Sequence, residues 1–192
     1  MYLRKLLSIR SRVAAVSAGV LLLAISSAFG ATPWEDLGQS KWVMEGVAHP
    51  KHLVYVITDA NCPYCHELWS ELRPFYRQGL AVRYVMVGIL TDTSPGKAAA
   101  ILEASDPAMA LDRAETRWNT LRDDTGGGIA PLTRPAPAVH AELKGNEALM
   151  RELGVQGTPA LLYRDTAGKL HLMQSVPDAG SLAAIVKSAS AS

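Results

Sequence analysis

The stretch Asn61-Cys62-Pro63-Tyr64-Cys65-His66 holds the only two cysteines of the 192-residue chain, and two residues separate them. A run of apolar and β-branched residues, 53–58, comes directly before it, as is typical of a buried strand. Apolar residues at helical spacing follow it from Leu68 onward. The pattern predicts that the cysteine pair lies where a buried strand ends and a helix begins.

This position has consequences for the chemistry of the pair. A helix N-terminus presents free N–H groups and a partial positive charge, and both stabilise a thiolate over a thiol. Cysteines in such sites have pKa values of roughly 3.5–7.5 instead of ~8.5. We therefore predict that Cys62 is exposed and activated, and that Cys65, one turn further on, is more covered. A disulfide between them would close a very small ring and add little stability, so we interpret the pair as a redox reagent.

The rest of the chain predicts an alternation of strands and helices around this pair. Strands are expected near 42–44 and at 52–59, 80–90, 160–163 and 169–174, and helices at 62–78, from 94 to 104, 106–121, 138–153 and 178–187. A C-x-x-C beside a βαβ pattern is the sequence cue for a redox fold. We predict an α/β, thioredoxin-like fold with a helical insertion between the βαβ half and the β-hairpin–helix half.

A second motif, Thr158-Pro159, opens the apolar strand that starts at residue 160. In a thioredoxin-like fold this proline is expected to be cis and to face the cysteines, leaving nearby backbone groups to pair with an extended substrate. The alternative is an ordinary trans proline at a strand start. Tyr64 could offer an aromatic face to the substrate, or could simply be exposed. We therefore take Tyr64, Thr158 and Pro159 as candidate substrate-binding residues.

The first thirty residues have the composition of a secretory signal peptide. A basic start is followed by an apolar core over residues 13–25 and by Ala28-Phe29-Gly30, which suits cleavage before Ala31. Residues 31–45 are then interpreted as a lead-in segment, 46–188 as the catalytic domain and 189–192 as a disordered tail. Export places the cysteines in an oxidising compartment, where a disulfide can persist. The predicted location is the periplasm.

The net charge favours no nucleic-acid or lipid partner. Four basic and no acidic residues lie in the first thirty, so the remainder has 15 Lys and Arg against 18 Asp and Glu, a formal charge of −3. The slight positive charge of the whole chain is therefore a property of the targeting segment.

The chain resembles the catalytic domain of the periplasmic thiol:disulfide interchange proteins of the DsbC/DsbG family, and most of all its DsbG members. The residues that carry the resemblance span nearly the whole segment after residue 30: Gln39-Ser40-Lys41-Trp42, Val54-Tyr55-Val56, Cys62-Pro63-Tyr64-Cys65, Ala98-Ala99-Ala100-Ile101-Leu102, Asp106-Pro107-Ala108, Asn146-Glu147 with Leu149-Met150, and Thr158-Pro159-Ala160. The resemblance implies that Cys62 is the attacking cysteine, Cys65 the resolving one, and Thr158-Pro159 the loop beside them.

The resemblance also implies partners. These are unfolded or cysteine-containing exported proteins and a membrane redox partner, and no cofactor is expected. Members of the family carry an N-terminal dimerisation domain, and only about a dozen residues separate the predicted cleavage site from Trp42. We therefore expect a monomer, and the direction of electron flow stays open between oxidase, reductase and isomerase.

Two other interpretations of the same residues remain. Cys62-Pro63-Tyr64-Cys65-His66 also spells C-x-x-C-H, the attachment signature of c-type haem. Alternatively, Cys62, Cys65 and His66 could carry Cu(I) or Zn, although a closed site lacks a fourth donor. We favour exchange chemistry and predict no metal. His66 is otherwise expected to be solvated, or else to add positive charge near Cys62. Asp59 is expected to cap the strand end, or else to accept a proton from Cys65.

Overall fold

The structure, a computed structural model, describes residues 32–121 and 124–191. The predicted signal peptide, residues 1–30, lies outside the described residues. In chain order the elements are α1 (Pro33–Gln39), β1 (Trp42–Gly46), β2 (His52–Asp59), α2 (Pro63–Tyr76), β3 (Leu80–Val87), α3 (Ser94–Leu102), α4 (Pro107–Thr116), α5 (Pro137–Glu152), β4 (Ala160–Arg164), β5 (Leu170–Met173) and α6 (Ala179–Ser188). No helix in these two ranges is long and apolar enough to cross a membrane.

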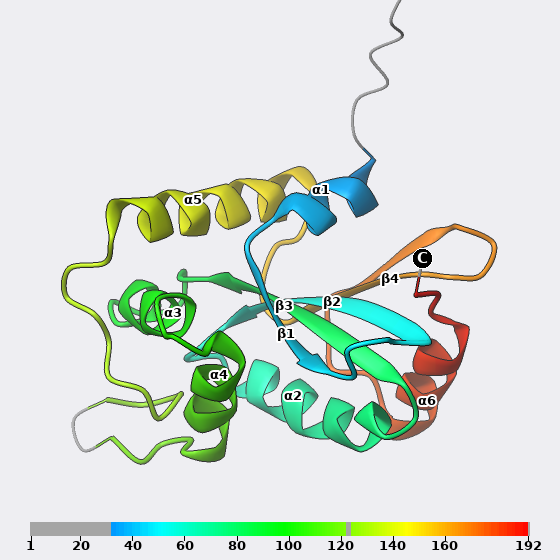
Figure 1. Ribbon diagram of the computed structural model, residues 1–192, viewed down its shortest axis with the longest axis horizontal. Coiled ribbons are helices and arrows are strands. Elements are labelled where there is room, and N and C mark those ends of the chain that lie inside the picture. The colour runs from blue at the N-terminus through cyan, green and yellow to red at the C-terminus, as the bar shows by residue number, and fades with distance from the viewer. Residues whose placement is uncertain (1–31, 122–123, 192) are drawn as a thin grey trace, which may run out of the picture. The chain divides into compact units, whose positions relative to one another are not determined.

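The strands form one five-stranded mixed sheet in the order β1-β3-β2-β4-β5. The central strand β2 runs parallel to β3 and antiparallel to β4 (Figure 1). The helices α3, α4 and α5 are inserted between β3 and β4. This arrangement confirms the predicted thioredoxin-like fold with a helical insertion between its two halves.

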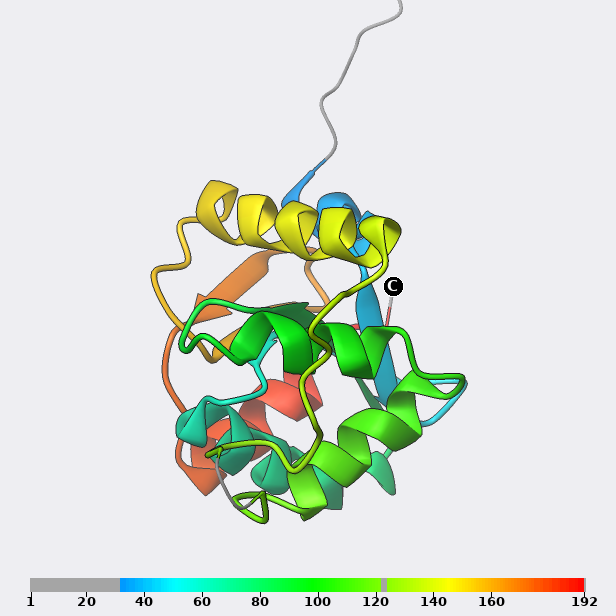
Figure 2. The ribbon, with the colours of Figure 1, turned by 90° about the vertical axis from the view of Figure 1, so that its left-hand side faces the viewer.

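Both faces of the sheet are covered, which explains why β2 is apolar along nearly its whole length. Val54 and Val56 pack into a core shared with α2, α3, α4 and α6. Tyr55 and Ile57 point the other way, into a second core shared with α1 and α5. Figures 1 and 2 show α1 and α5 together on one side of the sheet and α2 and α6 on the other.

The predicted lead-in segment, residues 31–45, contains a helix that the sequence analysis missed. The Thr32 hydroxyl accepts a hydrogen bond from the Glu35 N–H at 3.3 Å, and the Glu35 carboxylate accepts one from the Thr32 N–H at 2.7 Å. This reciprocal cap starts α1. With Leu37 as its one buried residue, so short a helix lacks an apolar periodicity that could reveal it.

The prediction of a disordered tail over residues 189–192 is wrong for the part that the structure describes. Ala189 is buried and pairs with Asp165, next to the end of β4. The Ser190 N–H donates to the Arg164 carbonyl at 2.7 Å, and the Ser190 carbonyl accepts from the Leu53 N–H at 3.3 Å. The tail is therefore fixed by main-chain pairing, which composition does not reveal.

The topology brings several chain segments to one edge of the sheet. Strands β2 and β3 are parallel, so their carboxyl ends meet there, and the antiparallel strand β4 begins at the same edge. The Cys62 turn follows β2, and Thr158-Pro159 precedes β4. Residues that are 96 positions apart in sequence therefore lie side by side.

Candidate active site

Cys62 is the N-cap residue of α2, as predicted from the junction of strand and helix. Its backbone is extended (φ −85°, ψ 113°), and its Sγ accepts a hydrogen bond from the Cys65 N–H at 3.3 Å. The Cys62 N–H donates to the Asp59 carbonyl at 3.0 Å, which fixes the turn between β2 and α2. Both cysteines are free thiols in this structure.

The environments of the two sulfur atoms differ. The pKa of Cys62 is lowered to about 6 by the hydrogen bond from the Cys65 thiol, then by the Thr158 hydroxyl and by the N–H groups of Cys65 and Tyr64, while burial opposes the shift. Burial raises the pKa of Cys65, and the hydrogen bond to Cys62 and its charge raise it further. At neutral pH the pair therefore holds one thiolate, at Cys62, and one thiol, at Cys65.

The loop before β4 lies against Cys62. The Thr158–Pro159 peptide bond is cis, and the Cys62 thiol donates to the Thr158 carbonyl at 3.3 Å. The Thr158 hydroxyl oxygen is buried and has no hydrogen-bond partner within the described part of the chain. It is thus a free donor for the sulfur once the thiolate forms.

The expectation that Cys62 is exposed is wrong for this structure. The residue is 2 % exposed, as is Cys65, and the Thr158 carbonyl lies against the Cys62 sulfur. Tyr64, between the two cysteines, is 63 % exposed. A partner must therefore reach the sulfur between the Tyr64 turn and the Thr158 loop.

A hollow of about 400 Å³ lies at this place. It is lined by Tyr64 and Glu67 from α2, by Thr158 and Pro159, and by Gln174, Ser175 and Val176 after β5. The structure brings all three candidate substrate-binding residues to this one hollow. The segment after β5 was not singled out from sequence, since nothing local marks it.

His66 is only partly solvated, since its side chain is half-buried. Its Nδ1 lies 2.8 Å from Oε2 of Glu115 on α4, and its ring stacks on Trp118 with 4.5 Å between centroids. Burial lowers the pKa of His66. Within the described residues no group of three or more His, Cys, Asp or Glu could hold a metal ion, so His66 forms no such group with the cysteines.

Glu115 is a further residue at the site that sequence reasoning missed. It is 3 % exposed, and burial raises its pKa to about 8, with further contributions from the charges of Glu45 and of the Cys62 thiolate. A glutamate 49 positions after His66 in a helix carries no local signal of this contact. Only the packing of α4 on α2 produces it.

Asp59 has the predicted capping role. One carboxylate oxygen accepts from the Asn61 N–H at 2.9 Å and the Ser94 hydroxyl at 2.8 Å, and the other from the N–H groups of Ile89 and Leu90 at 2.8 and 3.1 Å. These bonds tie the loop after β3 to the residues just before Cys62. Asp59 thus stiffens the turn that carries the redox pair.

The glycine triplet at 126–128 supports the same turn. The Gly127 N–H donates to the Ala60 carbonyl at 2.7 Å. Gly126 has φ +88°, and a Cβ there would lie 2.3 Å from the Asn61 side chain. The glycines therefore permit a close approach to the residues before Cys62.

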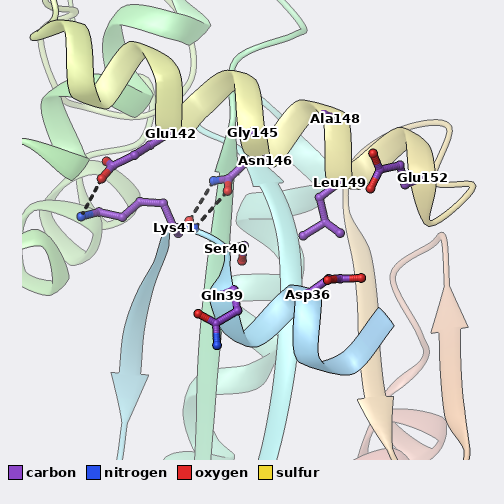
Figure 3. Close-up of a pocket in the computed structure, with 10 residues that line it drawn as sticks. All are labelled: Asp36, Gln39, Ser40, Lys41, Glu142, Gly145, Asn146, Ala148, Leu149 and Glu152. Carbon is purple, nitrogen blue, oxygen red and sulfur yellow. Dashed lines mark hydrogen bonds and ion pairs between the residues drawn. The ribbon is translucent and has the colours of Figure 1, made fainter. Parts of the chain in front are cut away.

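A second hollow, of about 420 Å³, lies between α1 and α5 and includes neither cysteine (Figure 3). Asn146 bridges its floor, since its amide donates to the Lys41 and Met86 carbonyls at 2.8 Å each and accepts from the Lys41 N–H at 3.1 Å. The Lys41 ammonium nitrogen lies 3.5 Å from Oε1 of the Glu142 carboxylate. These contacts join α5 to β1 and β3, so we interpret them as structural.

Comparison with known proteins agrees with this geometry. A family model described as a thioredoxin-like domain matches residues 45–190. The chain is 34% identical to the thiol:disulfide interchange protein DsbG of Pseudomonas aeruginosa, over 80% of this chain and 58% of that protein. It is 33% identical to DsbG of Escherichia coli, over 80% of this chain and 60% of that protein. The chain thus spans about three fifths of the length of these relatives.

Solved structures show the same fold at lower identity. A periplasmic thioredoxin-like protein from Salmonella enterica serovar Typhimurium matches with a TM-score of 0.64 at 24% identity, over 81% of this chain and 94% of that chain. The catalytic domain of Proteus mirabilis ScsC matches with a TM-score of 0.63 at 22% identity, over 80% of this chain and 92% of that chain.

Proposed function

Because this chain belongs to the family of thioredoxin-like domains, we propose that it exchanges disulfides with cysteine-containing proteins through Cys62 and Cys65. The observation that carries the proposal is the asymmetry of the pair, a stabilised thiolate at Cys62 beside a buried thiol at Cys65. Exchange needs an attacking thiolate, a disulfide sulfur and a resolving thiol nearby. The haem and metal interpretations account for none of this asymmetry.

In the reducing direction, the Cys62 thiolate attacks one sulfur of a substrate disulfide. A Cys62–substrate disulfide forms, and the other substrate sulfur leaves as a thiolate that takes up a proton. Cys65 then loses its proton and attacks Cys62, which releases the second substrate thiolate and leaves a Cys62–Cys65 disulfide. The substrate gains two electrons and the pair loses two.

The oxidising direction is the same sequence in reverse. A substrate thiolate attacks the sulfur of Cys62 in the disulfide, and Cys65 leaves. The lowered pKa of Cys62 stabilises the reduced pair, which makes its disulfide a stronger oxidant. This supports donation of disulfides as the direction to test first.

Substrate binding is proposed at the hollow beside the pair. Tyr64 offers an exposed aromatic ring, and Thr158 and Pro159 lie on the opposite side of the approach to the sulfur. An extended segment of a partly folded protein would fit such an open hollow better than a compact surface would. Backbone groups of the loop before β4 would pair with that segment.

The proposal includes export and a redox partner. Residues 1–30 have the pattern of a signal peptide, and a relative of the same fold is named as periplasmic. We propose that the protein acts in the periplasm as a monomer, and that a membrane protein resets the pair after each turnover. Light scattering of the purified protein tests the proposed monomeric state by measuring its molar mass in solution.

Two substitutions test the role of each cysteine. Cys62→Ala is expected to abolish both insulin reduction and dithiol oxidation, because no attacking sulfur remains. Cys65→Ala is expected to accumulate mixed disulfides at Cys62, detected by non-reducing electrophoresis and mass spectrometry, because nothing resolves them. Each variant is the control for the other, and full activity of Cys62→Ala would show that the assignment is wrong.

A further inference from the structure

The mechanism above leaves an ionisable pair beside the cysteines without a role, the buried Glu115 and the half-buried His66. His66 directly follows Cys65, and its backbone N–H donates to the Cys62 carbonyl at 3.1 Å. Its imidazole Nδ1 lies 2.8 Å from the Glu115 carboxyl oxygen. The pair therefore connects the first turn of α2, which carries both cysteines, to the helical insertion.

The imidazole is held in a fixed orientation. Its ring lies nearly parallel to Trp118 (11°, 4.5 Å between centroids) and to Trp69 (16°, 6.1 Å). The guanidinium of Arg73 covers the Trp69 ring at 4.4 Å and is itself paired with Asp112 at 2.7 Å. The stack therefore keeps Nδ1 of His66 directed at the Glu115 carboxyl group.

The charges around Glu115 explain why the pair holds a proton. Burial disfavours the carboxylate and raises the pKa of Glu115. The charge of Glu45, from β1, raises it further, and the Cys62 thiolate on α2 does the same. Tyr84, from β3, and Tyr76, from α2, are also titratable, and burial raises the pKa of both far enough for them to stay neutral. The redox-dependent charge among these is the Cys62 thiolate, which vanishes when the cysteines form a disulfide.

We propose that the Glu115–His66 pair takes up a proton when the cysteines are reduced and releases it when they are oxidised. The inference rests on the proposed function, since it assigns a second proton of the same exchange. When a substrate dithiol reduces the Cys62–Cys65 disulfide, the substrate loses two electrons and two protons. One proton goes to Cys65 and the other to the Glu115–His66 pair, while Cys62 remains a thiolate. Solvent then neither supplies nor accepts a proton.

The equilibrium with glutathione measures this proton directly. Oxidation of the reduced protein by glutathione disulfide forms two glutathione thiols, which need two protons. In the wild type both come from the protein, from Cys65 and from the Glu115–His66 pair. Over the pH range in which the reduced protein holds both protons and the oxidised protein holds neither, the equilibrium constant should therefore change by less than about threefold per pH unit. In Glu115→Gln one proton must come from solvent, and the constant should fall roughly tenfold per pH unit.

Further variants separate this role from a structural one. Glu115→Met removes the carboxyl with an apolar side chain of similar length and should give the same steep dependence as Glu115→Gln. Glu115→Asp keeps a carboxyl and should restore the shallow one. Glu71→Gln, at an exposed position on α2 outside the stack, should behave as the wild type. A purely structural role of Glu115 would change the midpoint of unfolding and leave the pH dependence of the equilibrium unmoved.

The outcomes are distinct. Equal pH dependence in the wild type, Glu115→Gln and Glu115→Met overturns the inference and leaves the proposed function standing. A wild-type protein whose cysteines do not equilibrate with glutathione overturns both. A steep dependence confined to the two variants without a carboxyl supports both.

Discussion

Relative to the reduced Cys62→Ser variant, the reduced wild type should lose stability as the pH falls. The folded-state pKa of Cys62 is about 6, below its ordinary value of 9.0. A lowered pKa contributes stability that is fully present above the unfolded value and is lost as the pH falls through the folded one. From these two values, the thiolate contributes roughly 2 kcal/mol more to the free energy of unfolding at pH ~8 than at pH ~6.

The measurement is urea unfolding of the reduced wild type and the reduced Cys62→Ser variant at both pH values, followed by tryptophan fluorescence. Other titrating groups contribute to both proteins, so the difference between them reports the Cys62 thiol together with the effect of its charge on Glu115. The wild type should lose roughly 2 kcal/mol more than the variant between the two pH values. Parallel pH dependence in the two proteins would refute the argument that the folded structure stabilises the thiolate.

Three further substitutions test the surroundings of the pair. Thr158→Val removes a hydroxyl that stabilises the thiolate, so alkylation of Cys62 by iodoacetamide below pH ~6 should slow roughly tenfold. Gly126→Ala places a Cβ 2.3 Å from the Asn61 side chain at φ +88°, and should cost roughly 1–3 kcal/mol in denaturant unfolding and lower the exchange rate. Asn146→Ala leaves the buried Met86 carbonyl and the half-buried Lys41 carbonyl without this partner and should cost roughly 2–4 kcal/mol, with the pKa of Cys62 unchanged.

The sequence predicted the elements that have a long apolar pattern or a strong start signal. The apolar run of β2 and the helical spacing after Cys65 each extend over several residues, so local pattern was sufficient. The helix α1 and the paired residue Ser190 were missed for a common reason. Their order comes from a reciprocal cap and from main-chain bonds to distant segments, and neither leaves a periodic signal.

The chain alone determined the identity of the reacting atoms, because two cysteines at the start of a helix are defined by neighbours in sequence. It also determined that Thr158-Pro159 opens a strand. The tertiary structure alone decided that Cys62 is covered by the Thr158 loop and that Glu115 meets His66. Both contacts join segments 49 or 96 residues apart, whose meeting depends on how strands pair and helices pack and not on any local pattern.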